Sequence, residues 1–214
     1  MNQATSTCDR ILDSAEQLFA EEGFHATSLR QITQAAEVNL AAVNYHFGSK
    51  QALILAVFRR RLDALNRARL VQLEQALAQG KPPQLEAVLE AFVVPALAFT
   101  HGSADAGHRF MRILMRALAD RDEQLHRALS AEYAHVMQRF ARAIAEALPG
   151  LHERDLRRQL DFIVGALTYT MAECEVSDGR EIAADLVRFA AAGLRKAISS
   201  RTKPGAVRTL EIHP

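Results

Sequence analysis

The sequence has no tryptophan, and aromatic residues make up only 6% of its 214 positions. No segment alternates apolar and polar residues as a half-buried strand does, and charged residues interrupt every apolar run well before the roughly 18 residues that a membrane span requires. The abundant residues are Ala, Leu, Arg, Glu and Gln, which all favour helix. We therefore expect an all-α, soluble protein, and the absence of a secretory signal pattern indicates the cytoplasm.

An excess of charge of either sign is also lacking, because 26 Lys and Arg stand against 25 Asp and Glu. No overall field attracts nucleic acid, so any DNA-binding face has to be local. The two cysteines, Cys8 and Cys174, fit neither a CxxC nor a zinc spacing. We interpret them as reduced structural thiols of a cytosolic protein.

Catalytic and metal-binding patterns are missing as well. The eight histidines form no HExxH motif, and no serine or cysteine lies in a nucleophile motif. The sequence therefore predicts neither an enzyme nor a metal or cofactor site. Two alternatives to a DNA-binding protein stay open: an enzyme whose site is assembled from distant residues, and a helical scaffold. DNA binding that weakens steeply with salt would separate a DNA-binding protein from both.

Apolar periodicity and capping residues predict three short helices at the N-terminus. The first carries an apolar stripe and ends at Gly23 in a left-handed cap. Ser28 and Gln31 form a capping box for the second, and Asn39 caps a third of two turns. The stripe of the first helix consists of Ile11, Leu12, Ala15, Leu18 and Phe19, and the second helix shares a face of Leu29, Ile32, Ala35 and Ala36.

The rest of the chain is predicted to be long helices separated by Gly and Pro breaks. A helix capped by Ser49 extends to about Gln79, where Gly80-Lys81-Pro82-Pro83 ends it. Pro95 should kink or split the helix that contains it. The remaining helices are expected at about 85–101, 105–118, 121–148, 153–174 and 180–199, and residues 201–214 as a disordered tail.

The span 28–47 has the spacing of a helix-turn-helix, in which a second helix enters the DNA major groove while the first supports it. Val43 and Phe47 should face inward. The outward face combines small residues with an amide, a phenol and an imidazole, which suit base edges and phosphates. It consists of Leu40, Ala41, Ala42, Asn44, Tyr45 and His46. Lys50 begins the next helix, where its ammonium can hold a phosphate.

Three runs, ILDSAEQLFAEEGF at 11–24, TSLRQI at 27–32 and VNLAAVNYHFGSK at 38–50, resemble the N-terminal head of the tetracycline-repressor (TetR) family. The resemblance covers about residues 9–58. It implies an all-helical homodimer, usually a repressor, that leaves its DNA operator when a small molecule occupies the C-terminal body. The implied domains are a helix-turn-helix head at 1–50, with the helix at about 49–79 as the connection, and a ligand-binding and dimerisation body at 51–200. A cytoplasmic, nucleoid-associated location follows.

The resemblance also assigns DNA contacts residue by residue. Phosphate contacts are implied for Thr27, Ser28, Tyr45, His46 and Lys50, and positions at or near the bases for Arg30, Asn39, Leu40, Ala42 and Asn44. Tyr45 packing on the next helix and Asn39 acting only as a cap are the alternatives. Many relatives have Gly at the position of Glu37 and Tyr at that of Asn44. The head's acidic residues are expected on a solvated face: Asp9, Asp13, Glu16, Glu21 and Glu22.

In the body, Met and Phe side chains on several helices can surround an apolar pocket, although ordinary core is the alternative. The predicted ligand-binding residues are Phe92, Phe99, Met111, Met115, Tyr133, Met137, Phe162 and Tyr169. Relatives with a similar recognition run include regulators of fatty-acid metabolism, which implies a fatty acid or acyl-CoA as effector. Its head group would pair with Arg109, Arg112 and Arg116, unless these form a solvated stripe.

The last two helices interleave large apolar and small residues, which lets helices of two subunits approach closely. We predict the homodimer interface there. Its residues are Leu156, Leu160, Ile163, Leu167, Leu186, Phe189, Ala190, Gly193 and Leu194. Two heads related by a twofold axis would read a palindromic operator in successive major-groove segments.

Overall fold

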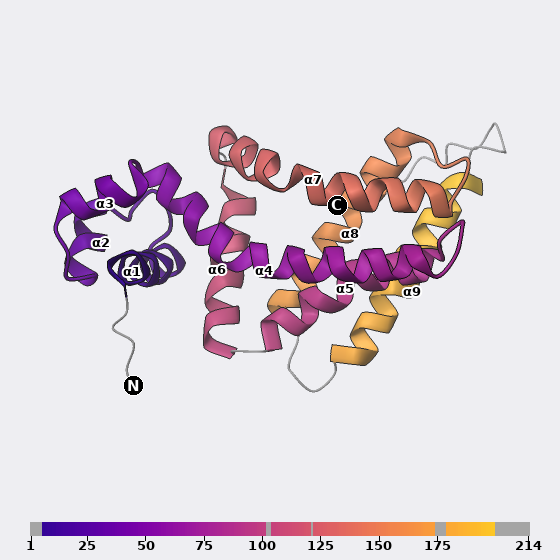
Figure 1. The fold of residues 1–214 in the computed structure, drawn as a ribbon, viewed down its shortest axis with the longest axis horizontal. Coiled ribbons are helices and arrows are strands. Elements are labelled where there is room, and N and C mark those ends of the chain that lie inside the picture. The colour runs from indigo at the N-terminus through magenta and orange to yellow at the C-terminus, as the bar shows by residue number, and fades with distance from the viewer. Residues whose placement is uncertain (1–5, 102–103, 121, 174–178, 200–214) are drawn as a thin grey trace, which may run out of the picture.

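The computed structural model describes residues 6–101, 104–120, 122–173 and 179–199, and these contain nine α-helices and no strand. The first three helices form a compact head: α1 (Thr7–Glu21), α2 (Leu29–Ala35) and α3 (Leu40–Phe47). The long α4 (Lys50–Ala78) runs from the head along the body, as Figure 1 shows. Cys174 and the expected tail 201–214 lie outside the described residues.

The body consists of five further helices whose bounds agree with the sequence prediction to within two residues in the described chain. Pro95 lies inside α5 without splitting it. α5 packs against both α4 and α9, and an ion pair of 2.7 Å between Glu86 and Arg195 ties its first turn to α9. The five helices are α5 (Leu85–His101), α6 (Ala104–Ala119), α7 (Glu123–Ala147), α8 (Glu153–Glu173) and α9 (Gly179–Ser199).

Local capping fixes where the helices of the head begin and end. Ser28 and Gln31 form the predicted capping box, and Asn39 and Ser49 accept from the backbone N–H three residues on. Gly23 follows α1 with φ +89°, a left-handed conformation that costs a glycine little. These caps set the short loops that hold α2 and α3 against α1. Ala35 is exposed, however, and does not share the buried face of α2.

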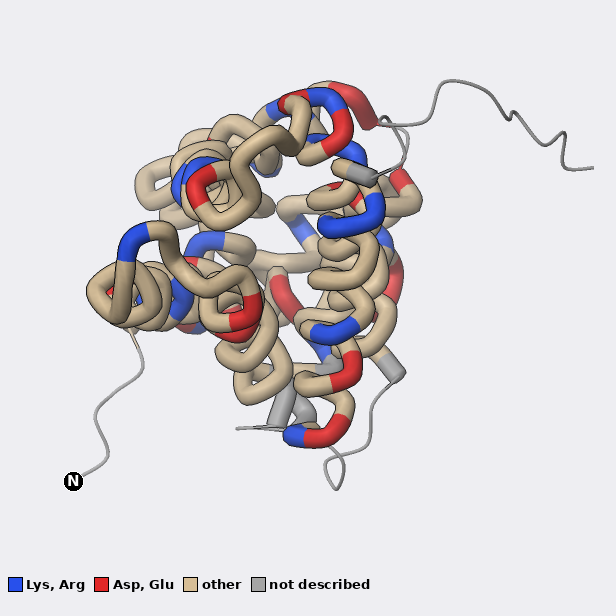
Figure 2. Tube along the Cα trace, turned by 90° about the vertical axis from the view of Figure 1, so that its right-hand side faces the viewer, with Lys and Arg blue, Asp and Glu red and all other residues tan. Residues whose placement is uncertain are grey.

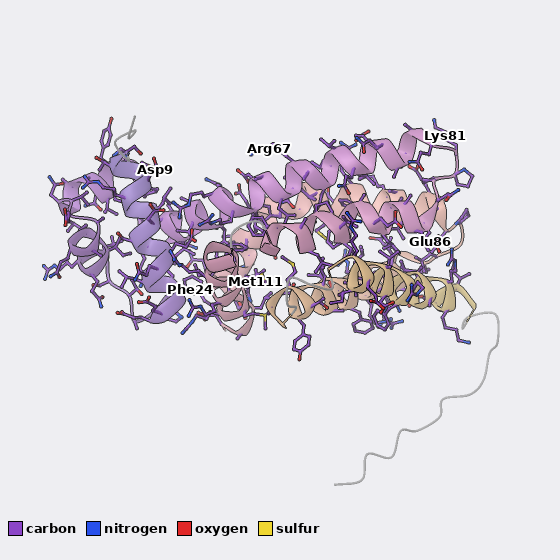
Figure 3. All side chains as sticks on the ribbon, turned by 90° about the horizontal axis from the view of Figure 1, so that it is seen from below. Asp9, Phe24, Arg67, Lys81, Glu86 and Met111 are labelled. Carbon is purple, nitrogen blue, oxygen red and sulfur yellow. The ribbon has the colours of Figure 1, made fainter. Side chains whose placement is uncertain are left out.

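Head and body share one continuous apolar core. Ring contacts run from Phe24 at the end of the head to Phe58 on α4, with centroids 6.4 Å apart, and from Phe58 to Phe110 on α6 at 5.8 Å. Figure 3 shows Phe24 where the head meets α6. These buried rings form a continuous path of packed contacts between α6 and the head.

A buried carboxylate joins α1 to α4. Glu16 is fully buried, and its two oxygens accept hydrogen bonds from Arg60 at 2.5 Å and from Arg61 at 2.6 Å. The expectation of a solvated Glu16 was therefore wrong, although Asp13 is exposed and pairs with Arg60. Burial alone would raise the pKa of Glu16, but the hydrogen bonds from Arg61 and Arg60 outweigh it and leave that pKa lowered.

None of the described helices is long and apolar enough to span a membrane. Cys8 is partly buried on α1, and burial, followed by the nearby Asp9 carboxylate, raises the pKa of its thiol. A raised thiol pKa disfavours the reactive thiolate, which agrees with a structural cysteine.

Candidate nucleic-acid interface

The third helix is held by its neighbours on one side and is open to solvent on the other. Val43 is fully buried against the head core, and α3 packs on α1, α2 and α4. Its outer face is exposed: Tyr45 has 86% of its surface accessible and Leu40 41%. Asn44 and His46 are exposed as well, while Ala42 is half-buried. The head therefore holds α3 in place and exposes its outer face to solvent.

The polar groups on this face suit a duplex groove. The Tyr45 and His46 rings lie edge to face with centroids 5.2 Å apart, so phenol and imidazole form one projecting surface. Because 86% of the Tyr45 surface is accessible, its side chain is not packed against α4, which disfavours that alternative. Asn39 caps α3 through a 2.8 Å bond from the Ala42 amide to its Oδ1, which uses one oxygen and leaves its amide nitrogen available.

One of the residues implied to contact phosphate is placed differently from the prediction. Thr27 is 1% exposed, and its hydroxyl donates to the carbonyl of Gly23 at 2.8 Å. The predicted Thr27 contact is therefore wrong, because its side chain is committed to the end of α1. Ser28 and Arg30 beside it are exposed and remain candidates.

Lys50 lies at the junction of head and body. It lines a cleft of about 250 Å³ with His25 on the head side and Asp122 at the start of α7, and burial lowers the pKa of its ammonium. Its contact with a phosphate stays a prediction. Two contacts near this cleft could not be predicted from the sequence, because they join residues 95 positions apart. His25 pairs with Asp120 at 3.1 Å, and Arg116 donates to the Glu21 carbonyl at 2.9 Å.

The outer face of α3 is not distinguished from the rest of the chain by a cluster of positive charge. Figure 2 shows Lys and Arg residues interspersed with Asp and Glu residues along the described part of the trace. Near α3 the cations are Arg30 and Lys50, and Glu37 in the preceding turn opposes them. Each cation that pairs with a phosphate contributes about 0.9 to the slope of log affinity against log salt, so these local cations, and not the net charge, set the salt dependence of DNA binding.

Glu37 occupies the left-handed region with φ 53°, which explains why glycine suits this position. We expect Glu37→Gly to raise the free energy of unfolding by about 1 kcal/mol, because glycine adopts this φ without steric cost. DNA affinity should rise several-fold, since a negative charge beside the phosphates is removed. Denaturant titration and fluorescence anisotropy with a bound duplex measure the two effects. Glu37→Gln is the control: it should raise affinity but not stability, and equal stabilisation by both variants would contradict the backbone explanation.

In the body, some of the predicted ligand-binding residues lie on the outer surface. Phe162 and Tyr169, predicted to bind ligand, are 57% and 63% exposed on the outer face of α8, so they do not line the subunit's interior. Met115 is 39% exposed. Phe92 and Met111 are buried and Phe99, Tyr133 and Met137 partly so, as a pocket or a core both require.

Most of the predicted interface residues are in fact core of their own subunit. Only Phe189, at 62% exposed, has a large free surface, while Leu160 and Gly193 are partly buried. A side chain without accessible surface in the single chain has none to bury against a partner. The correction concerns Leu156, Ile163, Leu167, Leu186, Ala190 and Leu194, all below 9% exposed.

Comparisons with known proteins agree with this architecture. The family model described as "Bacterial regulatory proteins, tetR family" matches residues 11–57, and that described as "Tetracyclin repressor-like, C-terminal domain" matches residues 90–193. The chain belongs to the tetR family of helix-turn-helix transcriptional regulators, which are DNA-binding proteins and not enzymes.

Individual relatives extend the likeness over most of the chain. The HTH-type transcriptional regulator UidR of Escherichia coli K12 is 26% identical over 147 residues, 68% of each chain. The HTH-type transcriptional repressor NicS of Pseudomonas putida is 35% identical over 91 residues, 42% of each. The solved structure of the fatty acid degradation regulator FadR from Bacillus halodurans superposes with a TM-score of 0.62, covering 97% of this chain and 99% of that one at 17% identity. At that identity the last comparison supports the fold alone.

Proposed function

We propose that this regulator is a repressor that binds a palindromic operator as a homodimer and is released by a small apolar or amphipathic effector. The observation that carries the proposal is the exposed outer face of α3, where Tyr45 projects from a helix that is otherwise fixed by the head core. The name of NicS, a repressor, supports the direction of regulation. Binding to chromosomal operators would place the protein on the nucleoid.

The course of α4 supports the domain division that we propose. We assign residues 1–50 to the DNA-binding head, 51–200 to the ligand-binding and dimerisation body, and 201–214 to a tail. α4 begins in the head and extends for 29 residues along the body, so it connects the two rigidly. Arg59 of α4 forms two 2.7 Å bonds with Glu132 of α7, which fixes this connection to a second body helix.

The dimer interface is assigned to the outer face of α8 and α9. Phe162, Tyr169 and Phe189 are each more than half exposed, and solvent-exposed aromatics at helical spacing indicate a surface that a partner covers. Gly165 and Ala192 are exposed between them, which allows close approach of helices. A twofold axis would bring the same face of each subunit together.

Phe189→Glu is expected to convert the dimer to a monomer. Because the change is repeated across the twofold axis, two unpaired carboxylates would enter the apolar interface, and we expect at least about 100-fold weaker association. Analytical ultracentrifugation over a concentration series measures the change. Val71→Glu on α4 is the matched control, since Val71 is 57% exposed and lies outside this face. A Phe189→Glu protein that stays dimeric at micromolar concentration would overturn the assignment.

Effector binding is proposed to act through α6. Phe110 of α6 contacts Phe58 and Phe99, so a ligand among the body helices that moves α6 also moves the head. The name of FadR, a fatty acid degradation regulator, supports a fatty acid or acyl-CoA as effector. Arg109 and Arg112 remain candidates for its head group, whereas Arg116 is engaged with the Glu21 carbonyl of the head.

Identifying the molecule that co-purifies with the protein tests the effector proposal. Mass spectrometry of an organic extract should reveal an apolar or amphipathic compound, and adding it back should lower DNA affinity at least tenfold. A compound that tightens DNA binding would instead make the protein a ligand-dependent binder and would contradict release.

A further inference from the structure

Arg69 of α4 is a partly buried guanidinium without a carboxylate partner among the described residues. Its Nε donates to the Phe92 carbonyl at 2.9 Å, its Nη1 to Asn66 Oδ1 at 3.4 Å, and the group lies 4.0 Å from the centre of the Phe92 ring. Burial lowers the pKa of Arg69 to about 10. A desolvated cation normally has a counter-ion, and here only neutral groups surround it.

Asn66 extends this donor-rich environment to the surface. Its side chain is almost buried, at 8% exposed, and because arginine has only donors, the Asn66 oxygen must face Arg69. The amide nitrogen therefore points away from Arg69, and Asn66 lines a cleft between α4 and α7. Within the described chain this nitrogen has no hydrogen-bond partner, so two N–H groups are available to an acceptor in the cleft.

A second polar group at the same cleft also lacks a partner. The Tyr133 hydroxyl of α7 is buried and makes no hydrogen bond with the described chain. Burial, followed by the Asp63 carboxylate, raises the pKa of Tyr133, so the hydroxyl keeps its proton and can donate. Buried polar groups are normally paired, so this buried hydroxyl, in a cleft that Asn66 also lines, indicates a missing ligand or water.

Charged side chains lie beside these hydrogen-bond donors at the edge of the cleft. Arg67 is exposed on α4, as Figure 3 shows, and His135 lies opposite on α7. Glu132 is neutralised by its paired bonds with Arg59, which leaves Asp63 as the acidic group of the lining that has no cationic partner among the described residues. Arg67 and the underlying Arg69 outweigh it.

We propose that the α4–α7 cleft binds the carboxylate group of a small molecule. A carboxylate offers acceptors only, which the Asn66 amide, the Tyr133 hydroxyl and the Arg67 guanidinium can share, with Arg69 behind Asn66 stabilising the charge. The cleft measures about 180 Å³. Pockets that enclose drug-sized ligands hold about 300–1,000 Å³, so this one admits a small acid or the acidic end of a longer one. The inference rests on the proposed function only where the acid is taken to be the effector.

Isothermal titration of the full-length protein, without DNA, tests binding directly. The probes are benzoate and octanoate, each compared with its neutral counterpart, benzyl alcohol or octan-1-ol. We expect at least one acid to bind about tenfold or more tightly than its alcohol. Equal affinity for acid and alcohol, tighter binding of a cation such as benzylammonium, or no binding of either acid at about 10 mM would overturn the proposal.

Asn66→Asp separates recognition from folding. The new carboxylate repels an anionic ligand and gives Arg69 a counter-ion, so the fold should be kept or strengthened while affinity for the acid falls at least about tenfold. Gln75→Glu, the same change of amide to acid nine residues along α4 and therefore on its opposite side, should leave affinity within about twofold. Tyr133→Phe should weaken binding several-fold without loss of thermal stability. If Asn66→Asp binds the acid as well as the unmodified protein does, Arg69 serves only to anchor the α5 carbonyl and the proposal fails.

These binding measurements test the cleft separately from the proposed repressor function. Acid binding that depends on Asn66 but leaves DNA affinity unchanged would support the cleft and contradict its use by the effector. Release of DNA by a compound that binds Asn66→Asp unchanged would support the proposed function and overturn the cleft as its site.

Discussion

Tyr45→Ala is expected to weaken operator binding by about 100-fold or more. A hydrogen bond to a charged group contributes about 1.5–3 kcal/mol, and the twofold dimer loses two of them together with the ring contacts. Because Tyr45 is 86% exposed, its loss should change the unfolding free energy by less than about 0.5 kcal/mol. Fluorescence anisotropy with a selected duplex, alongside circular dichroism, measures both quantities.

Two further variants show which part of the Tyr45 side chain is responsible and whether the effect is specific to the head. Tyr45→Phe keeps the ring and removes the hydroxyl, so an intermediate loss of affinity would assign part of the effect to the phosphate contact. Leu118→Ala is a control for removal of an exposed apolar side chain, since Leu118 is 54% exposed on α6 outside the head. Unchanged affinity in Tyr45→Ala would mean that α3 does not enter the groove in the orientation proposed.

Glu16→Gln should destabilise the protein by about 3 kcal/mol. Glu16 is fully buried, and the substitution leaves Arg60 and Arg61 without their shared negative charge. Asp13→Asn is the matched control, because Asp13 pairs with the same Arg60 from an exposed position and should cost less than about 1 kcal/mol. Denaturant unfolding at pH 7 measures both. A cost for Glu16→Gln no larger than that of Asp13→Asn would show that the buried cluster is not stabilising.

The stabilisation by Glu16 should also depend on pH in a defined direction. Its pKa is lowered in the folded state, so the unfolded chain takes up the proton first, near the ordinary value of about 4.3. The contribution is therefore complete above that value and is lost as the pH falls through the folded pKa. The difference between the unmodified protein and Glu16→Gln should shrink as the pH falls below about 4.3, the ordinary glutamate pKa.

The sequence was sufficient to predict most of what local chemistry decides. The caps at Ser28, Asn39 and Ser49 and the break at Gly23 depend on neighbours within four residues, and all four are confirmed. The short recognition helix and its family resemblance follow from the same local pattern. Glu37 was identified as a departure in the turn, and its positive φ gives the physical reason.

Contacts between distant segments could not be predicted in this way. Apolar periodicity shows that α8 has two apolar faces but not which one meets its own subunit, and the Leu-rich face proved internal while Phe162 and Tyr169 face outward. The family resemblance implied a DNA contact for Thr27, and the competing bond from its hydroxyl to the Gly23 carbonyl depends on a loop geometry that the sequence does not reveal. Glu16 was predicted on a solvated face, and its burial could not be anticipated because its two arginine partners lie 44 and 45 residues away in the sequence.

Selection from a pool of random-sequence DNA duplexes tests the central claim most directly, that paired copies of α3 read a double helix. The unmodified protein should enrich an inverted repeat whose half-sites lie in successive major-groove segments, and binding to it should weaken as salt rises. The Tyr45→Ala protein, folded and dimeric, should enrich nothing. Failure of the unmodified protein to enrich any sequence, or enrichment of the same repeat by Tyr45→Ala, would contradict the account.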